Sequence, residues 1–192
     1  IQPLGQQPEV MEMDTLINSV NCNDPKNIKD CKKTLKCPEG TEAIGVKYRA
    51  SEVFDSLGFV CTNGKESPML GGSSGKIETE VCKSGKFLSG VRVYINYLSG
   101  TKTKYPNLMQ IYCGDYASSS TFFGGNKHNS KGQTGPYDIG CKEKVMNGFD
   151  VEVGNSDANG HVYSIRNPIC KSKVAEGTQM EMGYLENSAG GK

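Results

Sequence analysis

The chain has 192 residues, which suits one domain with a sizeable hydrophobic core. Its 22 Lys and Arg residues and 21 Asp and Glu residues leave a net charge of +1, which excludes a strongly basic nucleic-acid-binding protein. With 35% hydrophobic residues, 24 Gly, 8 Pro and no long apolar run, the composition excludes a helical bundle and a membrane span and favours short strands.

The chain starts with a polar segment. Residues 1–21 predict an N-terminal tail or edge segment ahead of a single domain at 22–185. The start at Ile1, without Met or an apolar signal segment, is what we expect of a processed mature form. Five lysines then fall within eleven residues, opposed only by Asp30: Lys26, Lys29, Lys32, Lys33 and Lys36. This cluster predicts a solvated face, with an acidic glycan or a partner chain as the alternative contact.

Three blocks of similar sequence follow, and each is opened and closed by a cysteine. A glycine lies 8, 8 and 7 residues after the opening cysteine, and a glycine-marked segment follows each closing cysteine. The repeats extend near 37–72, 82–125 and 141–184. Three matching blocks predict an internal pseudo-threefold repeat.

Each block has the pattern of two strands joined by a turn. In the second block Val91, Val93 and Ile95 alternate with polar residues, and the segment 99–102 is turn-forming. The third block shows the same alternation on both sides of the polar loop 155–160. Each block therefore predicts an antiparallel hairpin.

The chain has eight cysteines, only two histidines and no Cys-x-x-Cys, which favours disulfides over a zinc site. Antiparallel pairing brings the opening and closing cysteines of a hairpin to the same end. We therefore expect the bridges Cys37–Cys61, Cys82–Cys113 and Cys141–Cys170, with Cys22–Cys31 by elimination. Disulfides persist in oxidising compartments, so we expect a secreted, extracellular or secretory-granule protein.

Three sheets that each bury one face can pack around a common axis. The sequence therefore predicts an all-β, three-sided β-prism with an internal pseudo-threefold repeat, stabilised by disulfides. The third repeat has no following connector, so we expect the segment before Cys37 to supply its missing strand. Residues 186–192 predict a C-terminal tail. The terminal segments are candidates for self-assembly, because an extended segment can add a strand to an exposed sheet edge.

These repeats resemble the vitelline membrane outer layer protein 1 family, whose fold is a β-prism with internal threefold symmetry. The resemblance covers roughly residues 35–184. It is carried by Cys-Pro-Glu-Gly at 37–40, Cys-Lys-Ser-Gly at 82–85 and a truncated third copy at 141–149. It implies sugar-binding surfaces and an activity on chitooligosaccharides.

The residues themselves predict no catalytic site. Two carboxylate pairs share strand faces, as glycosidic chemistry requires: Glu78 with Glu80 and Asp150 with Glu152. We interpret both pairs as solvated strand faces. The two histidines, His128 and His161, lie in turn-forming segments without a nucleophile motif and are expected at the surface.

Sugar recognition in a shallow loop site uses Asp or Asn for the hydroxyls and an aromatic face for the ring. The candidate ligand-binding residues are Asp115, Tyr116, Tyr137, Asp138, Asn155, Asp157 and Asn159. Their alternative role is that of ordinary turn and strand-end residues. No metal site and no cofactor are expected, because the loops lack the ligand order of a calcium loop.

The expected function is that of a secreted structural or interaction component of an extracellular coat, matrix or granule, with glycan recognition as its molecular activity. Glycans or other extracellular proteins are the expected partners, and nucleic acid is not. A soluble carbohydrate-binding lectin is the first alternative. A glycan-processing enzyme acting on chitooligosaccharides is the second, and it is implied only by the family resemblance.

Overall fold

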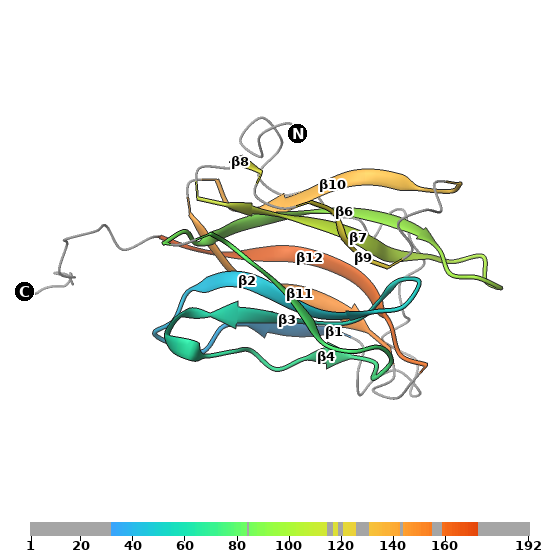
Figure 1. Ribbon diagram of the computed structural model, residues 1–192, viewed down its shortest axis with the longest axis horizontal. Coiled ribbons are helices and arrows are strands. Elements are labelled where there is room, and N and C mark those ends of the chain that lie inside the picture. Colours follow the sequence, from blue (N-terminus) through green and yellow to red (C-terminus); the bar gives the residue numbers. More distant parts are fainter. Residues whose placement is uncertain are drawn as a thin grey trace, which may run out of the picture.

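The computed structural model describes residues 32–83, 85–114, 117–118, 121–125, 131–142, 144–154 and 159–172. These residues form three antiparallel sheets that pack against one another (Figure 1). The predicted all-β prism with a pseudo-threefold repeat is confirmed. No helix among the described residues is long and apolar enough to cross a membrane.

Each sheet is built on one of the predicted hairpins. Sheet I has the order β4-β3-β2-β5, with β2 at Ala43–Ala50, β3 at Phe54–Cys61, β4 at Leu70–Gly71 and β5 at Glu78–Val81. A short 3-10 turn, Thr62–Gly64, follows β3.

Sheet II has the order β10-β6-β7-β8, and β9 also pairs with β7. Its strands are β6 at Leu88–Tyr97, β7 at Lys104–Cys113, β8 at Ala117–Ser118, β9 at Phe123–Gly124 and β10 at Thr134–Gly140. Sheet III has the order β1-β11-β12, with β1 at Lys32–Lys36, β11 at Val145–Val153 and β12 at Val162–Lys171.

The strand ahead of each opening cysteine joins the sheet of the preceding repeat. Before Cys82, β5 pairs with β2, and before Cys141, β10 pairs with β6. Before Cys37, β1 pairs with β11 of the third repeat, so the ring of sheets closes as predicted. The end of the third predicted repeat, residues 173–184, and the predicted tails at 1–21 and 186–192 lie outside the described residues.

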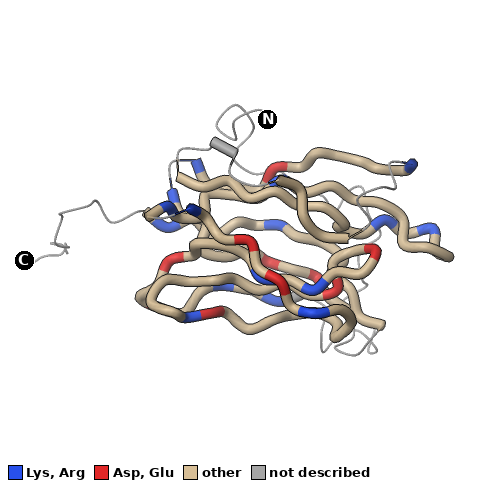
Figure 2. The backbone as a smooth tube through the Cα atoms, in the orientation of Figure 1, with Lys and Arg blue, Asp and Glu red and all other residues tan. Residues whose placement is uncertain are grey.

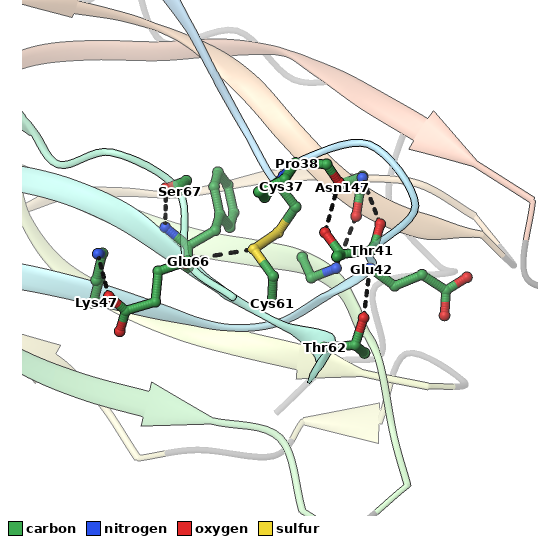
Figure 3. The surroundings of a disulfide bond; sticks show 12 residues. Cys37, Pro38, Thr41, Glu42, Lys47, Cys61, Thr62, Glu66, Ser67 and Asn147 are labelled. Atoms are coloured by element: carbon green, nitrogen blue, oxygen red, sulfur yellow. Dashed lines mark hydrogen bonds and ion pairs between the residues drawn. A yellow bond between two sulfur atoms is a disulfide. The ribbon is translucent and has the colours of Figure 1, made fainter. Parts of the chain in front are cut away.

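Backbone hydrogen bonds repeat this connection three times. The N–H of each opening cysteine donates to the carbonyl of the residue before the repeat glycine in the preceding sheet. The three bonds are Cys37 to Asn147 at 3.1 Å, Cys82 to Ile44 at 2.8 Å and Cys141 to Ser89 at 2.9 Å. At the first of them, the Asn147 side chain also accepts from the N–H of Ala43 and donates to the carbonyl of Thr41 (Figure 3).

The inner faces of the three sheets form one hydrophobic core. The alternating residues Val91, Val93 and Ile95 of β6 are fully buried, as their period of two predicts. Phe59 of sheet I packs against Phe149 of sheet III with ring centroids 4.8 Å apart. Burial of these side chains on the hydrophobic side of every sheet is the main source of stability.

The structure contains the three disulfides expected from the repeats, Cys37–Cys61, Cys82–Cys113 and Cys141–Cys170. Each joins the segment that opens a hairpin to the end of its closing strand, and Figure 3 shows the first of them. The expected Cys22–Cys31 bridge lies outside the described residues. A disulfide that closes a loop of this length restricts the unfolded chain and contributes roughly 3 to 4 kcal/mol in the chain-entropy model.

The repeat glycines allow neighbouring strands to approach closely. A Cβ at Gly45 would lie 2.4 Å from the carbonyl oxygen of Glu80 in β5. A Cβ at Gly148 would lie 2.4 Å from the carbonyl oxygen of Leu35 in β1. Real Cβ atoms do not approach backbone oxygens this closely, so the repeated glycine is needed where one repeat joins the next.

We expect Gly148→Ala to lower the free energy of unfolding by about 1 to 3 kcal/mol, because the added methyl group must push β1 away from β11. Urea denaturation followed by circular dichroism measures this loss. Gly58→Ala is the matched control, because its Cβ would first meet Lys47 Cε and Met69 Sδ in long side chains, and the nearest backbone oxygen, that of Pro68, would lie at 3.0 Å instead of 2.4 Å. Equal losses in the two variants would contradict the role assigned to the repeat glycine.

Candidate functional site at the hairpin end

The three hairpin loops gather at one end of the prism, which we call the hairpin end. Their described residues are 51–53 in sheet I, 98–103 in sheet II, and 154 and 159–161 in sheet III. The three disulfides lie at the other end of the same hairpins, which we call the disulfide end. Side-chain contacts at the hairpin end join each sheet to the other two.

A carboxylate joins the loops of sheets I and II. The backbone N–H of Ser99 donates to Glu52 Oε1 at 3.0 Å. Hydrogen bonds from the side chain and backbone of Ser99 lower the pKa of Glu52, and nearby His161 lowers it further. Glu52 is therefore an ionised hydrogen-bond acceptor at neutral pH.

A buried carboxylate joins sheets I and III. Asp55, at the start of β3, is fully buried, and its Oδ1 lies 2.7 Å from Nδ1 of His161. The His161 side chain is 15% exposed, so the expectation of an ordinary surface histidine is wrong. Asp55 Oδ2 has no hydrogen-bond partner among the described residues. Burying a carboxylate oxygen without a hydrogen-bond partner lowers the stability of the fold, so packing alone does not explain an aspartate at this position.

Aromatic rings join sheets II and III. The Tyr105 ring of β7 lies 5.6 Å from the His161 ring and 5.1 Å from the Tyr163 ring of β12, measured between centroids. Burial raises the pKa of Tyr105, and the neighbouring Tyr163 raises it further. The Tyr105 phenol is therefore neutral at physiological pH, and the partly exposed Tyr163 ring presents apolar surface beside it.

This arrangement is suited to binding a polar ligand that has an apolar face. The ionised Glu52 accepts hydrogen bonds, and the imidazole of His161 lies beside the rings of Tyr105 and Tyr163. Asn159, a predicted ligand residue, is exposed two positions before His161. Carboxylates, amides and aromatic rings in one shallow region are the groups that bind sugar hydroxyls and sugar ring faces.

The other predicted residues of this loop, Asn155 and Asp157, lie outside the described residues, as do Asp115 and Tyr116. The sequence reasoning missed Glu52, Asp55 and Tyr105. The sequence did contain an indication that Asp55 is buried, because alternation along the strand places it on the same face as the core residues Leu57 and Phe59. A charged residue in an inward-facing position of a strand indicates a specific partner.

Tyr137 and Asp138 lie within β10 rather than in a loop, and both are buried. Asp138 is 2% exposed and forms a bidentate ion pair with Arg92, with oxygen-to-nitrogen distances of 2.7 and 2.8 Å. The hydrogen bond to Asp138 raises the pKa of Arg92. The Arg92 guanidinium also lies 5.4 Å from the ring centroid of Tyr112. Both carboxylate oxygens of Asp138 therefore already have a partner within sheet II.

The carboxylates of the third-repeat pair considered for catalysis already have partners within the fold. Asp150 accepts hydrogen bonds from Thr34 at 2.8 Å and from Asn167 at 3.0 Å. Glu152 forms an ion pair with Arg166. Glu78 and Glu80 lie on the edge strand β5. Burial raises the pKa of Tyr48, and the negative charges of Glu78 and Glu80 raise it further. Among the described residues, no group of three His, Cys, Asp or Glu side chains is placed to hold a metal ion.

No protein-family model and no curated protein matches this chain. Among solved structures, it is similar to the prostate-specific WGA16 glycoprotein lectin, with a TM-score of 0.52, 12% identity, and coverage of 73% of this chain and 90% of that chain. It is also similar to the V. cholerae biofilm matrix protein Bap1, with a TM-score of 0.51, 16% identity and coverage of 73% of this chain but only 21% of that chain. These similarities show that this chain shares a β-prism fold with other proteins.

We expect Asp138→Asn to lower the free energy of unfolding by about 3 to 5 kcal/mol, because it leaves the buried Arg92 charge without its counter-charge. Urea denaturation measures the loss. The double variant Arg92→Met/Asp138→Leu should recover much of it, because it removes both charges. An Asp138→Asn protein of unchanged stability that loses sugar affinity would instead support the prediction that Asp138 is a ligand residue.

Burial, with a contribution from Asp138, raises the pKa of Tyr112 to about 12. A tyrosine in the unfolded chain titrates near pH 10, so above about pH 10 the unfolded chain releases a proton that the folded protein retains. We therefore expect the free energy of unfolding to fall as pH rises from about 10 to 12. Phenolate absorbance and urea denaturation measure the two effects.

Tyr112→Phe should remove this part of the pH dependence. Tyr97→Phe is the matched control, because the Tyr97 side chain is 46% exposed. An identical alkaline stability profile in the Tyr112→Phe and wild-type proteins would contradict the assignment.

Proposed function

We propose that this protein is a secreted, non-enzymatic glycan-recognition protein that serves as a structural or interaction component of an extracellular coat, matrix or granule. The observation that carries the proposal is the constellation of Glu52, Asp55, His161, Tyr105 and Tyr163 at the hairpin end. The partly exposed Glu52 supplies an acceptor for hydroxyl groups and the partly exposed His161 and Tyr163 supply ring surface, while the buried Asp55 and Tyr105 hold these groups in place. All three sheets contribute to the constellation.

In this proposal Glu52 accepts hydrogen bonds from sugar hydroxyl groups, and an apolar sugar face packs on the partly exposed Tyr163 ring, which the buried Tyr105 ring supports. The polar loop at 154–161 carries Asn155, Asp157 and Asn159, and we propose that these residues complete the site. Loops held on a rigid sheet scaffold commonly carry binding residues, since they change without disturbing the core.

The similar proteins support this function. One is named a glycoprotein lectin and another a biofilm matrix protein, so proteins of this fold include a lectin and a matrix component. The three disulfides are in keeping with an oxidising extracellular compartment. The resemblance to the vitelline membrane outer layer protein 1 family, carried by the opening motifs at 37–40 and 82–85, supports a coat or matrix role over that of a freely soluble lectin.

Binding rather than glycoside hydrolysis is the proposed activity of the site. A hydrolase of this type needs one carboxyl group whose pKa is raised so that it donates a proton to the leaving oxygen. At the hairpin end the pKa of Glu52 is lowered by Ser99, and Asp55 already contacts His161. These properties suit hydrogen-bond acceptors better than a proton donor.

Glu52→Gln is expected to weaken binding to a neutral glycan about tenfold, because a charged acceptor is replaced by a neutral amide. The wild-type ligand is first identified on a panel of immobilised neutral glycans, and affinities are then measured by calorimetry. Glu39→Gln, an exposed carboxylate at the disulfide end, is the matched control and should bind as the wild type does. Unchanged affinity in Glu52→Gln, or no binding of any neutral glycan by the wild type, would refute the proposed site.

A further inference from the structure

The disulfide end carries a second concentration of charge that the proposed site does not use. Five lysines lie within four residues after its cysteines, and we call them the lysine face: Lys83, Lys86, Lys142, Lys144 and Lys171. The first four are exposed and Lys171 is half-buried. None of the five forms an ion pair with another described residue.

The fold brings these lysines together from three separate segments. The N–H of the opening Cys141 donates to the carbonyl of Ser89, near the start of β6. Lys142 follows Cys141 and Lys86 precedes β6, so the segments that carry these two lysines are neighbours. Val145 of β11 is the register partner of Lys171, so Lys144 and Lys171 are also neighbours. The five lysines thus come from neighbouring segments at the ends of sheets II and III.

Figure 2 shows several Lys and Arg positions close together at the end where the C-terminal trace leaves the described chain. The acidic residues at this end are fewer. Glu42 lines one pocket with Lys86, Glu39 lines another with Lys171, and Glu143 follows Lys142 in the sequence. The charges of the whole chain nearly cancel at +1, so the lysine face is a local feature that composition does not reveal.

A cavity of about 440 Å³ borders the lysine face at Lys86. Ile44 and Phe87 give it apolar walls, and Glu42 lines it with a buried Oε2 that has no hydrogen-bond partner among the described residues. Such a cavity has room for a sugar ring, whose hydroxyl group can donate to Glu42 Oε2 while an anionic substituent meets Lys86. This combination favours a charged glycan over a nucleic acid or a lipid surface.

We propose that the lysine face and the adjoining cavity bind a sulfated polysaccharide. The choice of a glycan among polyanions rests on the proposed function, whereas the anion-binding surface rests on the lysines themselves. Lysines in a row attract a polyanion through charge, and each neutralised group releases a counterion, so the affinity falls as salt concentration rises. A chain with a neutral-sugar site at one end and a sulfated-glycan site at the other can bridge two polymers.

Dextran sulfate is the probe, with uncharged dextran as its reference, and binding is measured by calorimetry at low and physiological salt. We expect the triple variant Lys86→Gln/Lys142→Gln/Lys144→Gln to lose about tenfold or more in affinity at low salt and to show a weaker salt dependence. The control is Lys76→Gln/Lys102→Gln/Lys131→Gln, which removes the same charge from exposed positions near the hairpin end. It should change the affinity less than twofold, roughly the effect of a distant screened charge.

Equal losses in the two triple variants, or no binding of dextran sulfate by the wild type, would overturn the proposal. Binding to phosphatidylserine vesicles with none to dextran sulfate would assign the lysine face to a membrane surface instead. Each triple variant is also tested against the neutral glycan panel. If the wild-type protein binds dextran sulfate but no neutral glycan, only the hairpin-end site is refuted. The two proposals therefore fail separately.

Discussion

The pairing of each repeat with its predecessor is the constraint on which the rest of this structure depends. No repeat completes its own sheet, because the strand before each opening cysteine is hydrogen-bonded to the previous hairpin. The ring closes only when β1 joins β11, across more than a hundred residues of chain. Close backbone approach at Gly45 and Gly148 allows these connections, and the disulfides hold the hairpin ends that flank them.

This closure gives the prism two chemically different ends. Hairpin loops from all three sheets gather at one end, where Glu52, Asp55, His161 and two tyrosine rings contact one another across sheet boundaries. The segments that follow the cysteines gather at the other end and carry the lysine face. Strands of 8 to 10 residues separate the two ends. At about 3.3 Å per residue this spacing is roughly 25 to 35 Å, enough for one small domain to hold two separate polymers.

Most of the fold could be predicted from the sequence, because its signals are local and repeated. Alternation in β6 identified the buried face, and the cysteine spacing gave the three hairpin disulfides. The site was predicted less well. Tyr137 and Asp138 were interpreted as loop ligands because they precede a cysteine, but that segment is the strand that joins two repeats. The partner of Asp138 is Arg92, 46 residues earlier, and no local pattern identifies such a pair.

The sequence by itself determined the all-β class, the three hairpins, their disulfides and the use of the segment before Cys37 as a closing strand, because each follows from periodicity or from symmetry between repeats. Only the tertiary structure decided which polar side chains lie together. His161 meets Asp55 because loops of two sheets end at the same place in space, and Lys142 lies near Lys86 because β10 pairs with β6. Contacts between sheets depend on packing around the common axis, and packing of distant segments leaves no periodic trace in the sequence.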